Sequence, residues 1–294
     1  MAIKSKGLIK PNPLYSNNMK KILITGHKGF IGSHLFNEID AEGIDLKEGK
    51  DILDLTPFDL EGVDYIFHFA AFPKVPYSID HPIETNRNNI DATLHLLDCA
   101  AKARVKRLIY SASSSAYGNQ ETLPLTEDMK PNPLSPYAVQ KLTGEYYCKL
   151  YSEIYGLETV CLRYFNVYGE GMKVDDGYSA CLALFIDAKS KGLPLTVLGG
   201  KQTRDFTYVK DVINANILAS KSNKVGKGEV INIGSGESYS IEEIAKTISD
   251  NIIYKPQRQG EPMDTRADIS KAKELLNWSP SMNILLWLKN LKNN

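Results

Sequence analysis

Three glycines between a buried strand and a helix constrain the fold of this chain most strongly. Residues 21–25 are typical of a short buried strand, and we expect a helix to begin near Ser33. Glycines at this spacing let the backbone approach a pyrophosphate closely, and a helix N-terminus offers unpaired N–H groups and partial positive charge. The candidate cofactor contacts in this turn are Gly26, Gly29, Phe30, Ile31 and Gly32. The alternative is a tight turn without a ligand.

An acidic residue follows the glycines at the distance typical of a dinucleotide site. Asp45 fits the spacing of about 20 residues at which a carboxylate holds the adenosine ribose hydroxyls. A carboxylate there repels a 2′-phosphate, which favours NAD over NADP. Residues 50–54 predict a second short strand, and its Asp51 and Ile52 are candidates to flank the adenine.

The segment between these two acidic residues is short for a complete Rossmann unit. Five residues separate Asp45 from Asp51, whereas neighbouring parallel strands need a crossover of about a dozen residues or more. The crossover is therefore missing or reduced to a turn, and one of the two segments need not be a strand of the sheet.

A third strand, residues 63–71, ends in residues that leave room for a cofactor. Small side chains at the carboxyl end of a strand leave space at the switch point of an open α/β sheet. The candidates there are Phe69, Ala70 and Ala71. Residues 82–103 then have the apolar spacing of a helix. Asn89 lies near its start, as a cofactor contact or as a solvated side chain.

A serine cluster follows the next strand, residues 107–111. The cluster comprises Ser113, Ser114 and Ser115. It is either an ordinary turn or a source of hydroxyls that hydrogen-bond a reacting alcohol and a nearby phenol.

Tyr137 and Lys141 are four residues apart at the start of a predicted helix. Ser135 is a candidate N-cap, and Pro136 suits the first helical position. Spacing of four places Tyr137 and Lys141 on one helical face. A neighbouring ammonium favours a phenolate, and a bound cationic nicotinamide favours it further, so we expect a lowered pKa for Tyr137. The alternative is a packed tyrosine beside a solvated lysine.

Length and composition exclude several classes of function. At 294 residues, the chain is long for one hydrophobic core, so one large domain with a smaller lobe is expected. Lys plus Arg and Asp plus Glu both number 35, so nothing indicates a nucleic-acid partner. No apolar run is long enough for a bilayer, and residues 1–18 lack the apolar core of a signal peptide. The cysteines Cys99, Cys148, Cys161 and Cys181 are scattered, which favours buried thiols in the cytoplasm over a metal site.

These patterns predict an α/β protein with a Rossmann-type doubly wound parallel sheet and a smaller C-terminal α/β substrate lobe. We assign residues 1–18 to an N-terminal extension and 19–169 to the NAD-binding domain. Residues 170–294 form mainly the substrate lobe, with a partial return to the first domain. Arg204 and Arg258 are candidates to grip a diphosphate; a surface ion pair is the alternative for each.

Taken in order, the motifs resemble the extended short-chain dehydrogenase/reductase superfamily, and within it the NAD-dependent UDP-sugar 4-epimerases. The resemblance covers about residue 20 to 288. It rests on the glycine turn, the serine-rich strand end, Tyr-x-x-x-Lys, LRYFNVYG (162–169), RDFTYV (204–209), NIGSG (232–236) and TRADISKA (265–272).

The resemblance implies a role for individual residues. Tyr137 corresponds to the catalytic base, Lys141 to the lysine that binds the nicotinamide ribose, and Ser113 to the catalytic serine, with Ser114 and Ser115 close by. The implied substrate contacts are Ser113, Ser114, Asn166, Arg204 and Arg258, and the implied further cofactor contacts are Asn89 and Tyr164. Members usually pair as homodimers through helices near 86–103 and 137–155, and the large residues Tyr146, Tyr147, Leu150, Tyr151 and Ile154 are numerous enough to cover both a core face and a partner face.

The same resemblance implies a reaction that inverts carbon 4 of a UDP-hexose through a transient 4-keto sugar while NAD stays bound. Related dehydratases and decarboxylases carry acids where this chain has Ser114 and Ser115, which disfavours both. Thr265 stands where a bulky tyrosine would crowd an N-acetyl group, so we expect tolerance of N-acetylated hexoses, with UDP-glucose/UDP-galactose as a close rival. A UDP-glucuronate 4-epimerase, another NAD-dependent nucleotide-sugar dehydratase or reductase, and a non-catalytic NAD-sensing protein are the alternatives.

Overall fold

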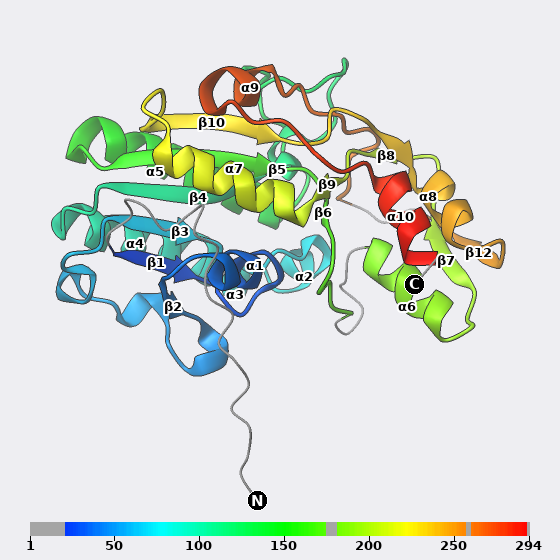
Figure 1. Cartoon of the computed structure of the whole chain (residues 1–294), viewed down its shortest axis with the longest axis horizontal. Helices are drawn as coiled ribbons and strands as arrows, with labels where there is room; N and C mark the ends of the chain where they lie inside the picture. Colours follow the sequence, from blue (N-terminus) through cyan, green and yellow to red (C-terminus); the bar gives the residue numbers. More distant parts are fainter. Residues whose placement is uncertain (1–20, 175–180, 257–259, 293–294) are drawn as a thin grey trace, which may run out of the picture.

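A six-stranded parallel sheet forms the centre of the larger body (Figure 1). The computed structural model describes residues 21–174, 181–256 and 260–292. In sheet order the strands are β10 (Lys227–Ile233), β5 (Glu158–Tyr164), β4 (Arg107–Ser113), β3 (Tyr65–His68), β1 (Ile22–Thr25) and β2 (Glu42–Ile44). Every neighbouring pair is parallel. The predicted α/β class is therefore confirmed.

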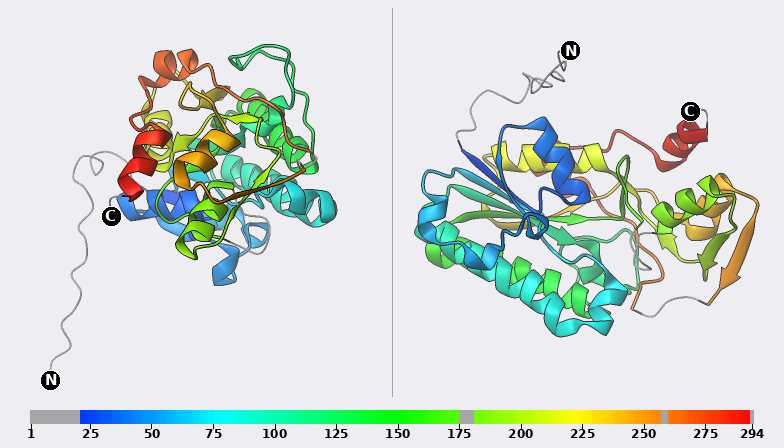
Figure 2. Two further views of the ribbon diagram at one scale, coloured as in Figure 1. Left: turned by 90° about the vertical axis from the view of Figure 1, so that its right-hand side faces the viewer. Right: turned by 90° about the horizontal axis from the view of Figure 1, so that it is seen from below.

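Helices cover both faces of this sheet, which gives three layers (Figure 2). One face packs against α1 (Phe30–Glu38), α7 (Val209–Lys221) and α9 (Ser270–Leu276) through a core that includes Leu35 and Val212. The other face packs against α4 (Ala92–Lys102) and α5 (Pro136–Tyr155) through a second core around Leu96, Leu108 and Cys161. Burial on both faces explains why the strands read as continuous apolar runs.

The segment after β2 differs from the expectation of a second strand. Residues 50–54 do not pair with the sheet; they belong to a series of single turns, 46–48, 52–54 and 57–60. The Asp51 carboxylate accepts a hydrogen bond from the backbone N–H of Leu53 at 3.0 Å, and such local bonds favour a turn over a strand. These single 3₁₀ turns, and no α-helix, connect β2 to β3, and β2 is the edge strand of the sheet. Earlier in the chain, α1 follows the glycine turn and begins at Phe30 rather than near Ser33.

The predicted helix over 82–103 is present but interrupted. It consists of α3 (Pro82–Asn86), one π-helical turn (Arg87–Asp91) and α4. A short helix, α2 (Val75–Asp80), precedes it and was not expected from the sequence. The π-helical turn carries Asn89, whose side chain is buried.

The smaller body lies beyond the carboxyl ends of the central strands (Figure 1). Its parallel pair β7 (Leu195–Leu198) and β12 (Ile252–Lys255) packs with α6 (Cys181–Ser190), α8 (Ile241–Ile248) and α10 (Ile284–Lys292). Two short pairs lie between the bodies: β6 (Val167–Tyr168) with β9 (Thr207–Tyr208), and β8 (Thr203–Arg204) with β11 (Tyr239–Ser240). Between its contributions to this body, the chain returns to the central sheet as α7, β10 and α9.

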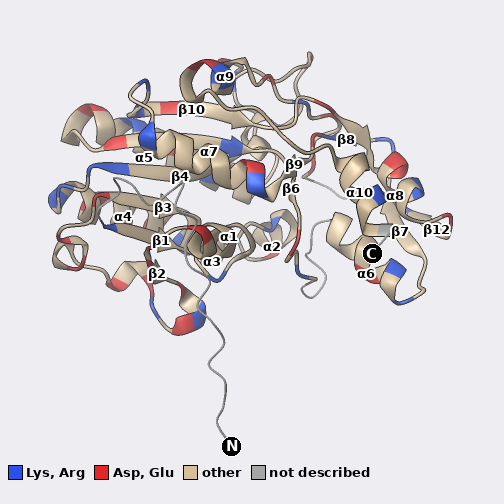
Figure 3. Cartoon of the chain, in the orientation of Figure 1, with Lys and Arg blue, Asp and Glu red and all other residues tan. Residues whose placement is uncertain are grey.

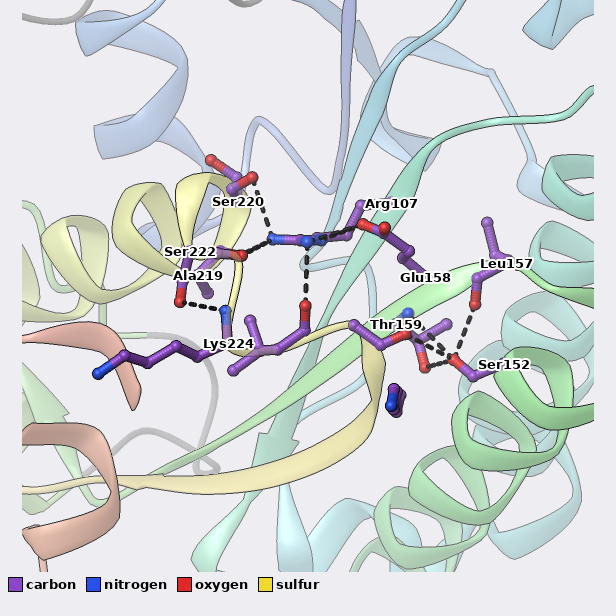
Figure 4. A network of polar contacts seen from close by, with 12 residues as sticks. Arg107, Ser152, Leu157, Glu158, Thr159, Ala219, Ser220, Ser222 and Lys224 are labelled. Carbon is purple, nitrogen blue, oxygen red and sulfur yellow. Dashed lines mark hydrogen bonds and ion pairs between the residues drawn. The ribbon is translucent and has the colours of Figure 1, made fainter. Parts of the chain in front are cut away.

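A buried arginine, Arg107, lies at the amino-terminal ends of the central strands and makes a network of polar contacts there (Figure 4). The Arg107 guanidinium donates to the carbonyls of Ala219 at 2.7 Å and Ser222 at 2.8 Å, at the end of α7, and to the Glu158 carboxylate at 2.8 Å. A cation at a helix C-terminus is favourable because the last carbonyls have no partner within the helix. Arg107 therefore joins β4, β5 and α7 at the edge that lacks the predicted site residues.

Charged residues of both signs and the cysteines are distributed through the described part of the chain. Basic and acidic residues are interspersed along the elements of both bodies (Figure 3). All four cysteines are free, and three of them are buried. Within residues 21–174, 181–256 and 260–292, no three or more His, Cys, Asp or Glu side chains are grouped to hold a metal ion. Across the same residues, no helix is both long and apolar enough to cross a membrane.

Gly144→Ala tests how closely α5 approaches β4. An added Cβ would lie within contact distance of the Tyr110 hydroxyl and ring, and Tyr110 is fully buried. In an exposed helix this change stabilises by about 1 kcal/mol, but here overpacking should dominate and cost about 1–3 kcal/mol. Urea unfolding measures the sign. The adjacent Thr143→Ala is the control and should be neutral or stabilising; a stabilised Gly144→Ala would contradict the packing.

Candidate active site

Four neighbouring central strands, β5, β4, β3 and β1, are parallel, so their carboxyl ends lie side by side. Thr25 of β1 is in register with His68 of β3, and Ser113 of β4 is in register with Tyr164 of β5. The strand order reverses between β1 and β3, and ligands of open α/β sheets bind outside the carboxyl ends at such a switch point. The predicted site residues that follow β1, β3, β4 and β5 therefore lie at the same edge.

The glycine turn fits a dinucleotide pyrophosphate. Gly26 has φ of +73°, and a Cβ there would lie 2.6 Å from the backbone N of Ala70, so glycine lets the turn approach the end of β3. Gly29 is the N-cap of α1 and supplies no side-chain cap. The first N–H groups of α1 thus remain available to an anion, with the positive end of the helix dipole behind them.

The carboxylate of Asp45 lies beside this turn. It accepts hydrogen bonds from the backbone N–H of Lys28 and of Lys47, both at 2.9 Å. Asp45 is thus held where a ribose would lie next to the glycine turn. Asp51 faces its own turn and, at 3.7 Å, Arg87; Ile52 is buried in the core. Contacts of Asp45, Asp51 and Ile52 with a cofactor stay predictions.

Helix α5 begins as the sequence predicts. The Ser135 hydroxyl accepts a hydrogen bond from the backbone N–H of Ala138 at 3.2 Å, and Pro136 occupies the first helical position. The backbone N–H of Tyr137 donates to the buried Ser78 hydroxyl at 3.0 Å, which ties the first turn of α5 to α2. The N-terminal end of α5 is fixed by these bonds, so Tyr137 is held in place.

Lys141 is buried, and its alternative as a solvated lysine is wrong. Its Nζ donates to the carbonyl of Ser111 at 2.9 Å and lies 5.0 Å from the centre of the Tyr110 ring. Burial lowers the pKa of Lys141 to about 8, because a charged ammonium is disfavoured out of water. With a pKa of about 8, the Lys141 ammonium loses its proton much closer to neutral pH than an exposed lysine does.

The pKa of Tyr137 shifts in the direction opposite to our expectation. Burial raises it, and the hydrogen bond from the Ser113 hydroxyl lowers it by less. The lowering of the Tyr137 pKa that we expected from Lys141 does not dominate, because the ammonium of Lys141 is directed at the Ser111 carbonyl. Tyr137 is therefore a neutral phenol in this environment, and it needs a further cation to become a base.

The serine cluster is arranged around Ser113. Ser113 caps the single turn 114–117 and accepts hydrogen bonds from the N–H of Ser115 at 3.2 Å and from its hydroxyl at 2.9 Å. Ser113 is also the member whose hydroxyl acts on the Tyr137 phenol. Ser114 lies one residue further on and is nearly buried. The cluster is thus both a turn and a source of a hydroxyl beside Tyr137.

Asn89 and Tyr164 are both buried and both hydrogen-bonded within the protein. The Asn89 amide accepts from the backbone N–H of Phe72 at 2.8 Å and donates to Gln140 at 2.7 Å, so a solvated Asn89 is wrong. It holds the loop after β3 against α5. The Tyr164 hydroxyl is bonded to Asn216 at 2.8 Å. Contacts of either residue with a cofactor stay predictions.

The predicted diphosphate residues come together only in part. Asn166 is exposed and donates to the carbonyl of Asp205 at 2.8 Å, so it lies beside the β8 strand that carries Arg204. Arg204 is buried and pairs with Glu261 at 3.2 Å, which is an ion pair but not a surface one. Arg258 lies outside the described residues.

A buried ion pair that the sequence analysis missed connects α5 with β5. Glu145, one turn after Lys141, receives two hydrogen bonds from Arg163 of β5, at 2.8 and 2.7 Å. The Arg163 guanidinium also lies 4.5 Å from the centre of the Tyr117 ring, just after the serine cluster. The pair joins α5, β5 and the end of β4. Spacing of four between Lys141 and Glu145 was its only local signal.

Comparisons with known proteins agree with this geometry. The model of the NAD dependent epimerase/dehydratase family matches residues 22–234. The chain is 34% identical to a putative UDP-glucose 4-epimerase of Methanocaldococcus jannaschii, over 92% of this chain and 98% of that protein.

Two solved structures share both fold and sequence. A UDP-N-acetylglucosamine 4-epimerase from Methanobrevibacter ruminantium, in complex with UDP-N-acetylmuramic acid, is 34% identical with a TM-score of 0.86, covering 92% of this chain and 96% of that one. A UDP-glucuronic acid 4-epimerase from Bacillus cereus, in complex with UDP-glucuronic acid and NAD, is 34% identical with a TM-score of 0.83, covering 92% and 97%.

Lys141→Met tests the burial of this ammonium through the pH dependence of stability. Between pH about 8 and 10.5, the unfolded chain binds a proton at Lys141 that the folded chain has lost, so folding stability should rise with pH in that range. Wild type minus Lys141→Met in free energy of unfolding should therefore increase between these values. Lys149→Met, exposed on the same helix, corrects for general effects of removing a lysine. A constant difference would contradict the buried ammonium.

Proposed function

This chain belongs to the NAD-dependent epimerase/dehydratase family, and on that premise we propose that it inverts carbon 4 of a UDP-hexose through a transient 4-keto sugar. It is an enzyme, and NAD is its cofactor. The observation that carries the proposal is the group formed by Tyr137, the Ser113 hydroxyl and the buried Lys141 at the sheet edge next to the glycine turn.

The chain's own residues account for the proton transfers. When bound, NAD supplies a cationic nicotinamide that takes up hydride from the sugar and returns it, so no external oxidant is needed. Its charge adds to that of Lys141 and favours the phenolate that burial disfavours. Tyr137 then accepts the proton of the 4-hydroxyl and gives it back to the keto oxygen after the sugar has turned over. Ser113 hydrogen-bonds the same oxygen.

The remote part of the substrate is held by the second body. Asn166 donates to the backbone carbonyl of Asp205, the residue that follows Arg204, and Asn166, Arg204 and Arg258 together would grip the diphosphate. Binding energy from a diphosphate that takes no part in the chemistry keeps the 4-keto sugar from escaping. The glycine turn, Asp45 and the end of β3 would hold the dinucleotide at the other side.

We favour a hexose that is allowed to carry an N-acetyl group. Two observations support this. Thr265 is small, and a solved relative is a UDP-N-acetylglucosamine 4-epimerase. UDP-glucuronate 4-epimerisation is the second candidate, supported by the Bacillus cereus enzyme at the same identity. A cytoplasmic location accords with the four free cysteines.

A panel of UDP-sugars tests the reaction directly. We expect the wild-type enzyme to convert UDP-glucose, UDP-galactose or their N-acetyl forms to the 4-epimer, resolved by chromatography. Tyr137→Phe should lose at least about a hundredfold in rate, the usual scale for a general base, with unchanged thermal unfolding. A wild type that converts no UDP-sugar, or a Tyr137→Phe that converts as fast as wild type, would refute the proposal.

We also propose a homodimer formed through the outer face of α5. Large apolar side chains remain exposed there at helical spacing: Val139, Tyr146, Leu150 and Ile154, with exposed fractions of 47, 56, 43 and 65%. Contiguous apolar surface of this kind is typical of an interface, and α4 packs beside it.

Ile154→Glu tests that face, since a buried carboxylate without a partner opposes association. We expect sedimentation to show a dimer for wild type and a monomer for the variant at micromolar concentration. Ile253→Glu, on an exposed strand of the second body, should remain dimeric. A wild type that sediments as a monomer would contradict the interface.

A further inference from the structure

Asp205 connects three segments that are far apart in the chain. Its carboxylate is fully buried, and one oxygen accepts hydrogen bonds from the N–H of Ser235 at 2.6 Å and from the Ser235 hydroxyl at 2.7 Å. The other oxygen accepts from the N–H groups of Gly236 and Ala267, both at 3.0 Å. A carboxylate offers about four acceptor positions, so all of them are in use and none faces a ligand.

The backbone of Asp205 is held as firmly as its side chain. Its N–H donates to the Thr265 hydroxyl at 3.3 Å, and its carbonyl accepts from the side chain of Asn166 at 2.8 Å. Gly234 makes this meeting possible, because a Cβ there would lie 2.9 Å from the Asp205 carboxylate and 2.5 Å from the Cβ of Ala267. The segments around 166, 235 and 266 are thereby fixed relative to Asp205.

This arrangement determines where two proposed substrate residues lie. Arg204 precedes Asp205 directly, and its guanidinium donates to the carbonyl of Met263 at 3.1 Å, in the segment that Asp205 anchors. Asn166 has φ of +21° and hydrogen-bonds to the Asp205 carbonyl. A shift of Asp205 would therefore move both residues together.

We propose that Asp205 is a positioning residue for binding of the nucleoside diphosphate, acting through Arg204 and Asn166 without touching the substrate. The inference rests on the proposed function, because it takes these two residues as the diphosphate grip. It assigns to Asp205 an effect on substrate affinity, while Tyr137, Ser113 and Lys141, on the central sheet and α5, keep their geometry.

Asp205→Asn tests this role with a nearly isosteric change. In either orientation the amide NH₂ faces at least one backbone N–H that the carboxylate accepted, that of Ser235 or those of Gly236 and Ala267, so the connection loosens without loss of volume. A buried donor left without an acceptor costs enough free energy to weaken binding by about tenfold or more. We expect the Kd for UDP, measured by calorimetry on the full chain, and the KM for the UDP-sugar to rise by about tenfold or more, with kcat nearly unchanged.

Asp211→Asn is the matched control. Asp211 is also a buried carboxylate, and it accepts from the N–H and hydroxyl of Ser281 and from the N–H of Met282. It anchors that segment to α7 and has no hydrogen bond to Arg204 or Asn166 among the described residues. We expect Asp211→Asn to lower the melting temperature while the Kd for UDP and the KM stay within about twofold of wild type.

Three further outcomes decide the inference. Ser235→Ala removes one of the four bonds and should weaken UDP binding by about two- to tenfold, the range for a single hydrogen bond, which keeps the proposal testable if Asp205→Asn does not fold. Equal effects of Asp205→Asn and Asp211→Asn on UDP affinity would overturn it. If wild type binds UDP but epimerises no sugar, the proposed function fails, whereas the affinity ratio of the two variants still decides the role of Asp205.

Discussion

The close packing of α5 on β4 is the contact on which the site depends. Gly144 allows the helix to approach the buried Tyr110 ring, and this approach brings Lys141 within 2.9 Å of the Ser111 carbonyl. Tyr137, one turn earlier, is then placed beside Ser113 at the end of the same strand. A residue with a Cβ at position 144 would move α5, so one local packing constraint sets the relative positions of Tyr137, Ser113 and Lys141.

Several ionisable side chains of this protein are buried, and burial affects their charge. Burial disfavours both the ammonium of Lys141, whose pKa falls to about 8, and the phenolate of Tyr137, whose pKa rises. At neutral pH Lys141 therefore keeps its charge, whereas Tyr137 stays a neutral phenol. Two buried carboxylates away from this group have hydrogen-bond partners within the protein. Glu145 pairs with Arg163, and Asp205 receives four hydrogen bonds.

Local patterns predicted what local contacts decide. The cap at Ser135 and the glycine turn depend on neighbours within a few residues, and both are present. The prediction of a strand over residues 50–54 was wrong because the Asp51 carboxylate accepts from the backbone N–H of Leu53, which apolar spacing does not reveal. The partners of Glu145 lie 18 residues away and those of Asp205 lie 30 to 62 residues away, so no window of sequence could show them. The pKa direction for Tyr137 was wrong because spacing predicts a neighbouring charge but not the extent of burial.

The most direct test of this account is the ionisation of the Tyr137 phenol. Tyrosinate absorbance can be titrated in NAD-loaded protein, with the Tyr137→Phe variant subtracted. The account predicts one phenol that ionises well below the ordinary pKa of about 10 when NAD is bound, and above it when NAD has been removed. Identical titrations of the two NAD-loaded proteins below pH about 10 would contradict the claim that Tyr137 becomes the base.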